Sequence, residues 1–206
     1  MNKYHKIATA WTRDPENNYK TLIEGDWATP EFAYLANSQW WFTEKIDGTN
    51  IRIMWDGQLR FGGKTDKAQL PAFLYEKLGE MFNPEMFSEF ESVCLYGEGY
   101  GAKIQKGGGN YIPDGVSFIL FDVRIGDYWL RRDDVYDIAT KMGIATAPVM
   151  GGGSLMAAVR FAQDGIQSTF GDFAAEGLVM RPAVELLDRA GRRVISKIKS
   201  KDFPSD

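Results

Sequence analysis

The stretch TEKIDGTN brings together the side chains that a nucleophilic site would need. Lys45 and Asp47 are separated by one residue, and Gly48 follows them. Side chains alternate along a strand, so a strand would place Lys45 and Asp47 on one face. Gly48 would allow a turn or the close approach of a ligand. A lysine amine becomes a nucleophile once it loses its proton, but this short motif is also typical of an exposed strand end.

Further polar residues occur at the ends of strand-like runs later in the chain. They are Glu98 in YGEGYG, Phe121 and Asp122 at the end of SFILFD, Glu176 at the start of EGLVMRP, and Lys197 and Lys199 in SKIKSK. A strand would place the two lysines on one face. Each residue has an ordinary interpretation by itself, as a turn glutamate, a strand-end aspartate or a solvated basic strand. Together they occur in the order lysine, glutamate, aromatic residue and aspartate, glutamate and glycine, then paired lysines, and this order indicates a common function.

Several other kinds of active site are excluded or disfavoured by the sequence. Cys94 is the only cysteine and His5 the only histidine, so a disulfide within the chain and a Cys/His zinc site are excluded. A Ser-His-Asp enzyme would have to use His5, in an unremarkable N-terminal segment. The sequence GGKT at 62–65 ends like a phosphate-binding loop, but position 58 is Gln where that motif needs glycine. Acid–base chemistry must therefore come from Lys, Asp, Glu or Tyr.

The composition is that of a globular protein with a substantial core. The chain has 206 residues, of which 44% are hydrophobic and 25% charged. No run approaches the ~18 apolar residues of a membrane helix, and the N-terminus lacks the apolar region of a secretory signal, so we expect a cytoplasmic protein that contacts no membrane. A net charge of -4 does not suggest a protein that coats nucleic acid, but it permits a local basic groove.

Short strands and turns dominate the pattern along the chain. NIRIMW and QLRF flank Asp56-Gly57, which predicts a hairpin. Residues after Pro71 predict a helix, and further helices are expected from Asp133 or Asp134 to Met142 and from Ser154 to Phe161. We therefore expect mainly antiparallel sheets with helices packed outside. Trp40 and Trp41 are interpreted as core residues, with nucleic-acid binding as the alternative.

The ordered set of motifs resembles the covalent nucleotidyltransferase superfamily, which comprises ATP-dependent ligases and mRNA capping enzymes. Within it, Thr49-Asn50, the IQK at 104–106 and the final KIKSK resemble the RNA ligases of the double-strand-sealing and RNA-editing type. The resemblance spans Lys45 to Lys201. It implies an α+β, ATP-grasp-like fold of two mainly antiparallel sheets flanked by helices, with the nucleotide in the groove between the sheets. We expect one adenylyltransferase domain over 1–206, with no OB-fold or other appended domain.

The resemblance also implies a role for each motif residue. Lys45 would attack ATP to form lysyl-AMP, with Mg²⁺ or Mn²⁺ held near Glu176 and Asp47. Lys197 and Lys199 would neutralise the α-phosphate, and Asp122 would belong to the same catalytic set. The nucleotide would be bound by backbone groups near Glu44, by Glu98 at the ribose, by Phe121 and Val179 on the two faces of adenine, by Arg181 at the triphosphate, and by Asn50 and Lys64 at the phosphates. Lys64 stands where the family usually has an arginine, and a lysine cannot bind a phosphate through a bidentate fork.

The implied substrate is an RNA end, most naturally at a nick in a duplex, with DNA or an RNA–DNA hybrid as alternatives. A monomer is expected, and a phage-encoded enzyme acting in the host cytoplasm would fit. Arg192 and Arg193, at a turn near the paired lysines, could reach further phosphates. Three other functions remain open, namely a DNA ligase for nicked duplex, a GTP-using capping enzyme, and a nucleotide-binding module without catalysis.

Overall fold

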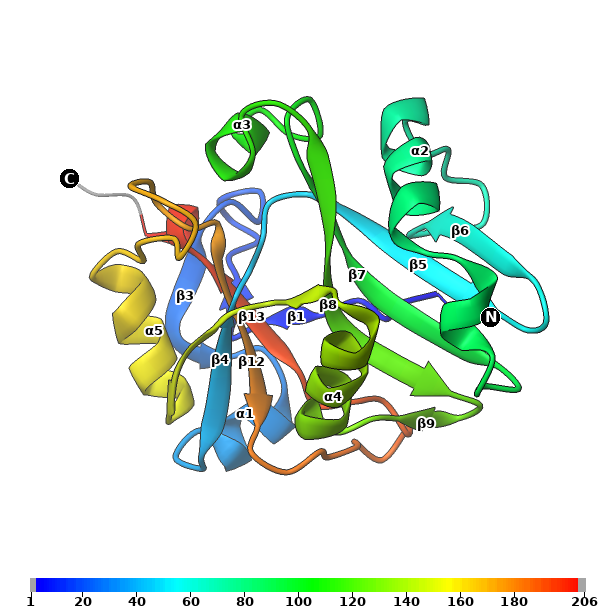
Figure 1. The fold of residues 1–206 in the computed structure, drawn as a ribbon. Helices are drawn as coiled ribbons and strands as arrows, with labels where there is room; N and C mark the ends of the chain where they lie inside the picture. Colours follow the sequence, from blue (N-terminus) through cyan, green and yellow to red (C-terminus); the bar gives the residue numbers. More distant parts are fainter. Residues whose placement is uncertain (1–2, 204–206) are drawn as a thin grey trace. The chain divides into compact units, whose positions relative to one another are not determined.

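The computed structural model of the protein describes residues 3–203, which form two compact units. Unit 1 contains the described residues up to His5 together with Asp47–Ala147. Unit 2 contains Lys6–Ile46 and the chain from Pro148 onward. Each unit has its own sheet and its own hydrophobic core (Figure 1).

The sheet of unit 1 has the strand order β10-β8-β7-β5-β6, and β9 pairs with β8. Only the pairing of β10 with β8 is parallel. The predicted hairpin joins β5 to β6 through Gly57, whose φ of 88° lies where glycine is favoured. The strands are β5 (Thr49–Trp55), β6 (Leu59–Gly63), β7 (Val93–Gly101), β8 (Val116–Ile125), β9 (Tyr128–Trp129) and β10 (Ala145–Thr146).

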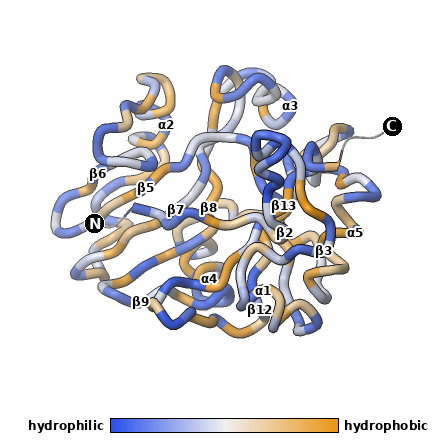
Figure 2. Tube along the Cα trace, turned by 180° about the vertical axis from the view of Figure 1, so that it is seen from behind, coloured by the Kyte–Doolittle hydropathy of each residue, from blue (hydrophilic) through white to orange (hydrophobic). Residues whose placement is uncertain are grey.

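Helices cover the apolar face of this sheet. The helix α2 (Ala72–Met81) buries Leu74 and Leu78, and Figure 2 shows its hydrophobic and hydrophilic residues interleaved. Full burial of one such leucine stabilises the fold by roughly 1.5–3 kcal/mol. The remaining helices are η1 (Pro84–Phe87), α3 (Gly108–Tyr111) and α4 (Arg132–Met142). The predicted cap of α4 was wrong, because Asp133 and Asp134 lie in its first turn, where a carboxylate still favours the helix dipole.

The larger sheet of unit 2 has the order β1-β13-β12-β4-β11. The pairing of β1 with β13 is parallel and the others are antiparallel. A separate hairpin consists of β2 (Trp11–Arg13) and β3 (Leu22–Trp27). The strands of the larger sheet are β1 (Ala8–Thr9), β4 (Trp40–Glu44), β11 (Val149–Gly153), β12 (Gly177–Pro182) and β13 (Ser196–Lys199). The helices are α1 (Pro30–Leu35), α5 (Leu155–Gln163) and η2 (Ser200–Asp202).

Alternate residues of β4 face the core of unit 2. Trp40 and Phe42 are buried with α5, while Trp41 is 47% exposed on the opposite face. The interpretation of both tryptophans as core residues is therefore right for Trp40 and wrong for Trp41. The helix α5 begins as predicted, since the Ser154 hydroxyl accepts a hydrogen bond from the Ala157 N–H at 3.1 Å.

The α+β fold with mainly antiparallel sheets is confirmed. Within residues 3–203, no helix combines the length and the apolar character needed to cross a bilayer.

Candidate active site

Lys45 directly follows β4, and the neighbouring strand β12 fixes its backbone. The Lys45 N–H donates to the carbonyl oxygen of Gly177 at 2.9 Å. Gly177 has to be glycine, because a Cβ there would lie 2.0 Å from the carbonyl oxygen of Ile198 on β13. The close approach of β12 and β13 brings Glu176, which directly precedes β12, next to Lys199 of β13.

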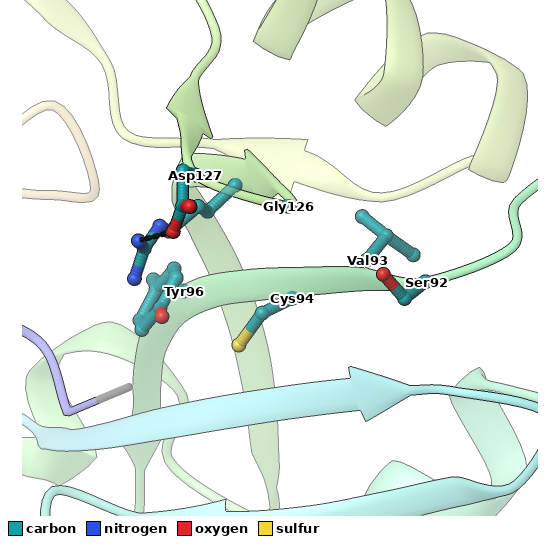
Figure 3. A pocket seen from close by; sticks show the side chains of 7 residues that line it. Ser92, Val93, Cys94, Tyr96, Gly126 and Asp127 are labelled. Carbon is teal, nitrogen blue, oxygen red and sulfur yellow. Dashed lines mark hydrogen bonds and ion pairs between the residues drawn. The ribbon is translucent and has the colours of Figure 1, made fainter. Parts of the chain in front are cut away.

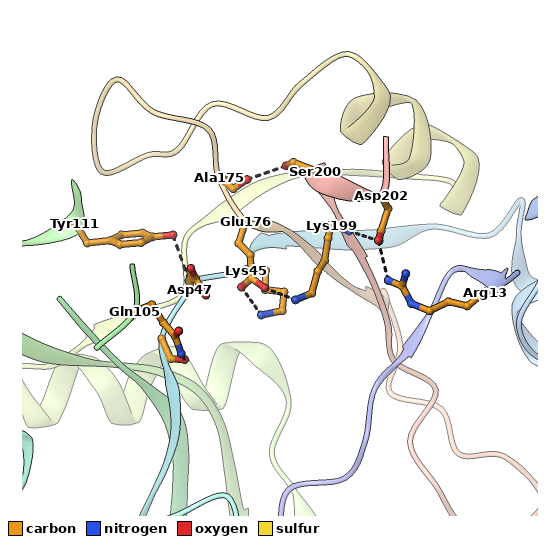
Figure 4. A network of polar contacts seen from close by, with 11 residues as sticks. Arg13, Lys45, Asp47, Gln105, Tyr111, Ala175, Glu176, Lys199, Ser200 and Asp202 are labelled. Carbon is orange, nitrogen blue, oxygen red and sulfur yellow. Dashed lines mark hydrogen bonds and ion pairs between the residues drawn. The ribbon is translucent and has the colours of Figure 1, made fainter. Parts of the chain in front are cut away.

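Glu176 connects the predicted nucleophile to the predicted phosphate-binding strand. Its Oε2 lies 2.5 Å from Lys45 Nζ, and its Oε1 lies 2.6 Å from Lys199 Nζ (Figure 4). All three side chains are largely but not completely buried. Two ammonium groups and one carboxylate leave a local net positive charge, which suits an anionic ligand.

The strand β13 has the alternation predicted for it. Ser196 and Ile198 are buried against the core, whereas Lys197 and Lys199 are half-buried on the other face. On that face Val179 of β12 lies between Lys197 and Thr43, its register partners on β13 and β4. The structure therefore brings Lys45, Glu176, Lys197, Lys199 and Val179 together on one face of one sheet.

Residues that the sequence did not single out fix the end of β13. The buried Asp202 accepts hydrogen bonds from the Lys199 N–H at 3.1 Å and from Arg13 at 2.8 Å (Figure 4). The Ser200 hydroxyl donates to the carbonyl oxygen of Ala175 at 2.7 Å, next to Glu176. Asp202 and Ser200 are ordinary residues in the sequence, and no local pattern distinguishes them.

Glu44 is part of the same region but has a different environment from its neighbour Lys45. It is buried, and its carboxylate accepts hydrogen bonds from the Ser168 hydroxyl at 2.6 Å, the Thr169 N–H at 2.9 Å and the Thr169 hydroxyl at 2.7 Å. Its N–H donates to the carbonyl oxygen of Pro148. The carboxylate of Glu44 therefore connects β4 to the loop that carries Ser168 and Thr169.

In unit 1, Gly48, Asn50 and Glu98 form a second group of predicted site residues. Asn50 of β5 is the register partner of Glu98 of β7. A Cβ on Gly48 would lie 2.3 Å from the carbonyl oxygen of Gly99 and 2.7 Å from Glu98 Cγ, so only glycine fits there. Asn50 Oδ1 is buried and has no hydrogen-bond partner among the described residues. Such an atom is normally satisfied by a donor, and here a ligand could supply one.

The segment around α3 holds the backbone of Asp47 and Gly48. The Asp47 N–H donates to the Tyr111 hydroxyl at 3.2 Å, and Gln105 Nε2 donates to the carbonyl oxygen of Gly48 at 3.0 Å (Figure 4). Gln105 is the central residue of the IQK motif. This contact gives that motif a structural role at the loop.

Phe121 and Asp122 lie at an irregularity in the pairing of β7 with β8. Tyr96 is opposite Asp122 and Gly97 is opposite Leu120, so Phe121 is the extra residue of a bulge. Bulges turn side chains out of the regular alternation. Asp122 is fully buried and accepts a hydrogen bond from the Tyr4 hydroxyl at 2.5 Å, while the Tyr4 ring meets Phe121 edge-on at 5.0 Å.

Lys64 is exposed just beyond β6. The neighbouring strand β5 carries the buried Arg52. Arg52 donates to the carbonyl oxygen of Gly63 at 2.8 Å and to Asp66 at 2.7 Å. Its hydrogen bond and positive charge lower the pKa of the Asp66 carboxyl. Arg52 therefore fixes the backbone next to Lys64.

Arg181, the remaining predicted residue, lies on β12 opposite Trp41 and is largely buried. Of the other two arginines considered, Arg193 is buried and pairs with Glu185 at 2.8 Å. Arg192 is exposed and pairs with Asp188 at 2.6 Å. Arg193 is therefore committed within the protein, contrary to its expected reach toward phosphates.

The model of the RNA ligase family matches residues 38–199. The chain belongs to the RNA ligase family. No curated protein matches its sequence. Among solved structures, it is similar to an RNA ligase mutant from Naegleria gruberi with ATP and Mn, at 18% identity over 81% of this chain and 52% of that one, with a TM-score of 0.63. An apo mutant of that ligase gives 17% identity over 84% and 52%, with a TM-score of 0.66.

A further structure of the Naegleria gruberi RNA ligase, with PPi, gives 17% identity over 82% of this chain and 52% of that chain, with a TM-score of 0.63. At these identities the likeness shows the fold. The chain spans about half the length of the ligases that it matches.

Two cavities of this RNA ligase family member contain none of the predicted site residues. One, of about 290 Å³ in unit 1, is lined by Cys94, Tyr96 and Asp127 among others (Figure 3). Burial raises the pKa of the Cys94 thiol and of the Tyr96 hydroxyl, so both are neutral at physiological pH. The other, of about 500 Å³ in unit 2, lies beside α5. Neither has the charge that a nucleotide requires.

Proposed function

We propose that this chain is an ATP-dependent RNA ligase that works through lysyl-AMP at Lys45. The observation that carries the proposal is the contact of Glu176 with both Lys45 and Lys199 on one sheet face. If Lys45 had only a structural role, it would not need a second lysine and a carboxylate shared with that lysine beside it. This arrangement supplies a nucleophile, a proton acceptor and positive charge for a phosphate.

In the first step, the amine of Lys45 attacks the α-phosphorus of ATP. The new N–P bond forms as the bond from the α-phosphorus to pyrophosphate breaks, and the amine loses a proton. Glu176 is within hydrogen-bond distance of Lys45 Nζ and is the candidate acceptor of that proton. Lys197 and Lys199 neutralise the oxygens of the transferring phosphoryl group, because stabilisation of this charge is the main contribution a protein makes to phosphoryl transfer.

The nucleoside-binding roles proposed for unit 1 follow the resemblance. Glu98 binds the ribose hydroxyls and Phe121 stacks on adenine, while Asn50 and Lys64 bind phosphate oxygens. The buried Oδ1 of Asn50, which lacks a partner among the described residues, supports a ligand that donates a hydrogen bond there, such as a hydroxyl, while a phosphate oxygen would have to accept from the Asn50 amide nitrogen. In unit 2, Val179 and Arg181 keep their proposed roles at adenine and the triphosphate. Asp122 acts through the position of Phe121, its neighbour in the bulge.

The residues present are compatible with magnesium. In the described part of the chain, no group of three or more His, Cys, Asp or Glu side chains is arranged to hold a metal ion. Mg²⁺ commonly uses only one or two carboxylates together with substrate phosphates and water, and Glu176 of unit 2 and Asp47 of unit 1 are each a candidate for such a carboxylate. A bound Mg²⁺ or Mn²⁺ would supply positive charge to the phosphate oxygens.

Two later steps complete the proposed reaction. AMP moves from Lys45 to a 5′-phosphate, and a 3′-hydroxyl then attacks that phosphate and displaces AMP, which forms the phosphodiester. We propose RNA ends at a nick in a duplex as the substrate, because base pairing there holds the 3′-hydroxyl next to the 5′-phosphate. The same proposal includes that the protein acts as a monomer in the cytoplasm and that residues 1–206 form a single adenylyltransferase domain.

A panel of nicked duplexes tests this function. The wild-type chain is incubated with ATP and magnesium on duplexes whose broken strand is RNA or DNA, and sealed product is measured. We expect sealing of the RNA strand, and none with Lys45→Ala, while Lys20→Ala, an exposed lysine of the same unit, behaves as wild type. Preferential sealing of DNA would support a DNA ligase, and stronger labelling of the protein by GTP than by ATP would support a capping enzyme.

A further inference from the structure

Two adjacent tryptophans of β4 have opposite environments. Trp40 is fully buried, and its Nε1 donates to the carbonyl oxygen of Leu35 at 2.9 Å. Trp41 is 47% exposed. Among the described residues, no other aromatic ring packs against Trp41. The core of unit 2 therefore explains Trp40 and does not explain Trp41.

Trp41 lies on the sheet face that carries the catalytic lysines. Every second residue of a strand lies on the same side. Trp41 therefore shares one side of β4 with Thr43, and with Lys45 directly after the strand. At a rise of ~3.3 Å per residue, Trp41 is about 13 Å from Lys45 along the strand. Its register partner on β12 is Arg181, and Lys197 lies one strand further across the sheet.

This face is positively charged although the chain as a whole has a net charge of -4. It carries Lys45, Lys197, Lys199 and Arg181, while the carboxylate of Glu176 is already shared by two of these lysines. An exposed aromatic ring on the same sheet face as several cations is the combination that binds single-stranded nucleic acid, in which phosphates meet positive charge and bases stack on rings. A polyanion whose bases have flat π-faces matches it better than an acidic peptide does, because each nucleotide supplies both a phosphate and a ring that can stack.

The backbone beside Trp41 leaves room for its indole. Gly152 of β11 is the register partner of Trp41, and a Cβ on Gly152 would lie 3.2 Å from Trp41 Cε3. The indole thus rests against a glycine on one side, and nearly half of the side chain remains accessible. An indole with this much accessible surface is available to stack on a base.

We propose that Trp41 is a stacking platform for an unpaired base of the RNA substrate. The proposal rests on the proposed function, since that function makes RNA the ligand. The stacked base lies on the indole while the neighbouring cations neutralise the phosphates of the same strand. Because every base has a π-face, this contact adds affinity with little sequence preference.

The test is direct binding of a short 5′-phosphorylated single-stranded RNA with a fluorescent label, followed by anisotropy without ATP. Trp41→Ala is expected to weaken binding roughly 5- to 100-fold, as loss of one base–aromatic stack does. Trp41→Phe keeps a ring and retains most of the affinity, whereas Trp41→Leu does not. Tyr34→Ala removes a ring that is 89% exposed on α1 of the same unit and serves as the matched control, with unchanged affinity.

A probe with abasic sugars in place of the nucleotides separates stacking from charge. We expect wild type and Trp41→Ala to bind this probe equally. Unchanged RNA affinity in Trp41→Ala would overturn the proposal, and so would Trp41→Leu binding as well as Trp41→Phe or an equal loss with the abasic probe. The binding assay needs no ATP and is therefore independent of lysyl-AMP formation. If wild type failed to form lysyl-AMP, the proposed function would be contradicted, but the measured effect of Trp41 on RNA binding would stand.

Discussion

Glu176 is the carboxylate on which the geometry at Lys45 depends. Its two oxygens contact the ammonium groups of Lys45, directly after β4, and of Lys199 on β13. Removal of the carboxylate would leave two partly buried ammonium groups near each other with no counter-charge. The positions of Lys45, the proposed nucleophile, and Lys199, the proposed phosphate-binding lysine, are therefore coupled through one side chain.

Glu176→Gln is expected to slow the attachment of AMP to the protein by roughly 10²-fold, a typical loss when one preorganised electrostatic group is removed. The amide keeps the shape of the side chain but neither its charge nor its ability to accept the amine proton. The measurement is the rate at which the folded protein acquires label from ATP. The protein is denatured before the bound label is counted. Glu24→Gln, at an exposed position of β3, is the control, and a wild-type rate in Glu176→Gln would show that the contact with Lys45 has no catalytic role.

Cys94 gives a second prediction at the level of one residue. Its side chain is buried, and burial raises the pKa of the thiol. Since the thiolate is the reactive form, we expect an alkylating reagent at about pH 8 to modify the folded protein slowly and the protein in denaturant quickly. The chain has no other cysteine, so the signal is unambiguous. Fast stoichiometric modification of the folded protein would contradict the burial.

At the scale of elements, the loop carrying Ser168 and Thr169 is tied to β4 through Glu44. Thr169→Val removes one hydroxyl donor to a buried carboxylate and changes the size of the side chain little. Hydrogen bonds to charged groups contribute about 1.5–3 kcal/mol, so we expect a loss of stability of that order, measured as a lower midpoint in urea. Thr140→Val, on the exposed face of α4, is the control. Equal midpoints for Thr169→Val and wild type would show that the hydrogen bond from the Thr169 hydroxyl to Glu44 does not stabilise the fold.

The chain beyond β6 is tied to β5 by the pair of Arg52 and Asp66. The pKa of Asp66 is lowered in the folded state, chiefly by its hydrogen bond to Arg52. Its contribution to stability is therefore present above the ordinary carboxyl pKa of 3.8 and is lost as the pH falls through the lowered value. We expect Asp66→Asn to be less stable than wild type at about pH 6, and the difference to shrink as the pH falls below 3.8.

The exposed Asp114→Asn is the control for that comparison. A stability difference between wild type and Asp66→Asn that stays constant from neutral to acidic pH would mean that the ion pair is not its source. Screening by salt should reduce the difference as well, because the carboxylate of Asp66 is 74% exposed.

Local patterns predicted the elements better than they predicted their environments. The hairpin at Gly57, the helix after Pro71 and the cap at Ser154 follow from turn and capping chemistry, which acts within a few residues. The exposure of Trp41 could not be predicted. When two adjacent residues of a strand are both hydrophobic, the sequence does not reveal which of them faces the core. The contacts of Asp202 with Arg13 and of Glu44 with Ser168 join distant parts of the chain, so no local signal reports them.

At the scale of the whole molecule, the number of cations available to phosphates is small. Arg193 is buried and paired with Glu185, whereas Lys197 and Lys199 are half-buried on the face proposed to bind phosphate and are the proposed contributors there. At about 0.7 per neutralised phosphate for a single strand, two or three contacts predict a slope of roughly -2 in log affinity against log salt. RNA binding measured over a salt series checks this value, and a much steeper slope would indicate a phosphate-binding surface elsewhere.

Weak binding of ends also predicts a preference among substrates. A nicked RNA duplex holds its two ends together by base pairing, whereas free single strands must be brought together by the protein. We therefore expect faster sealing of nicked duplex RNA than of single-stranded RNA at every salt concentration. Equal rates on both substrates would show that the protein itself aligns the ends.

The proposed reaction begins with the attachment of AMP to Lys45. The direct measurement is mass spectrometry of the protein after incubation with ATP and magnesium, followed by digestion and location of the adduct. We predict a mass increase of one AMP on the peptide containing Lys45, its release by pyrophosphate, and its absence in Lys45→Ala but not in Lys20→Ala. An AMP adduct on another residue, or an undiminished adduct in Lys45→Ala, would contradict the account.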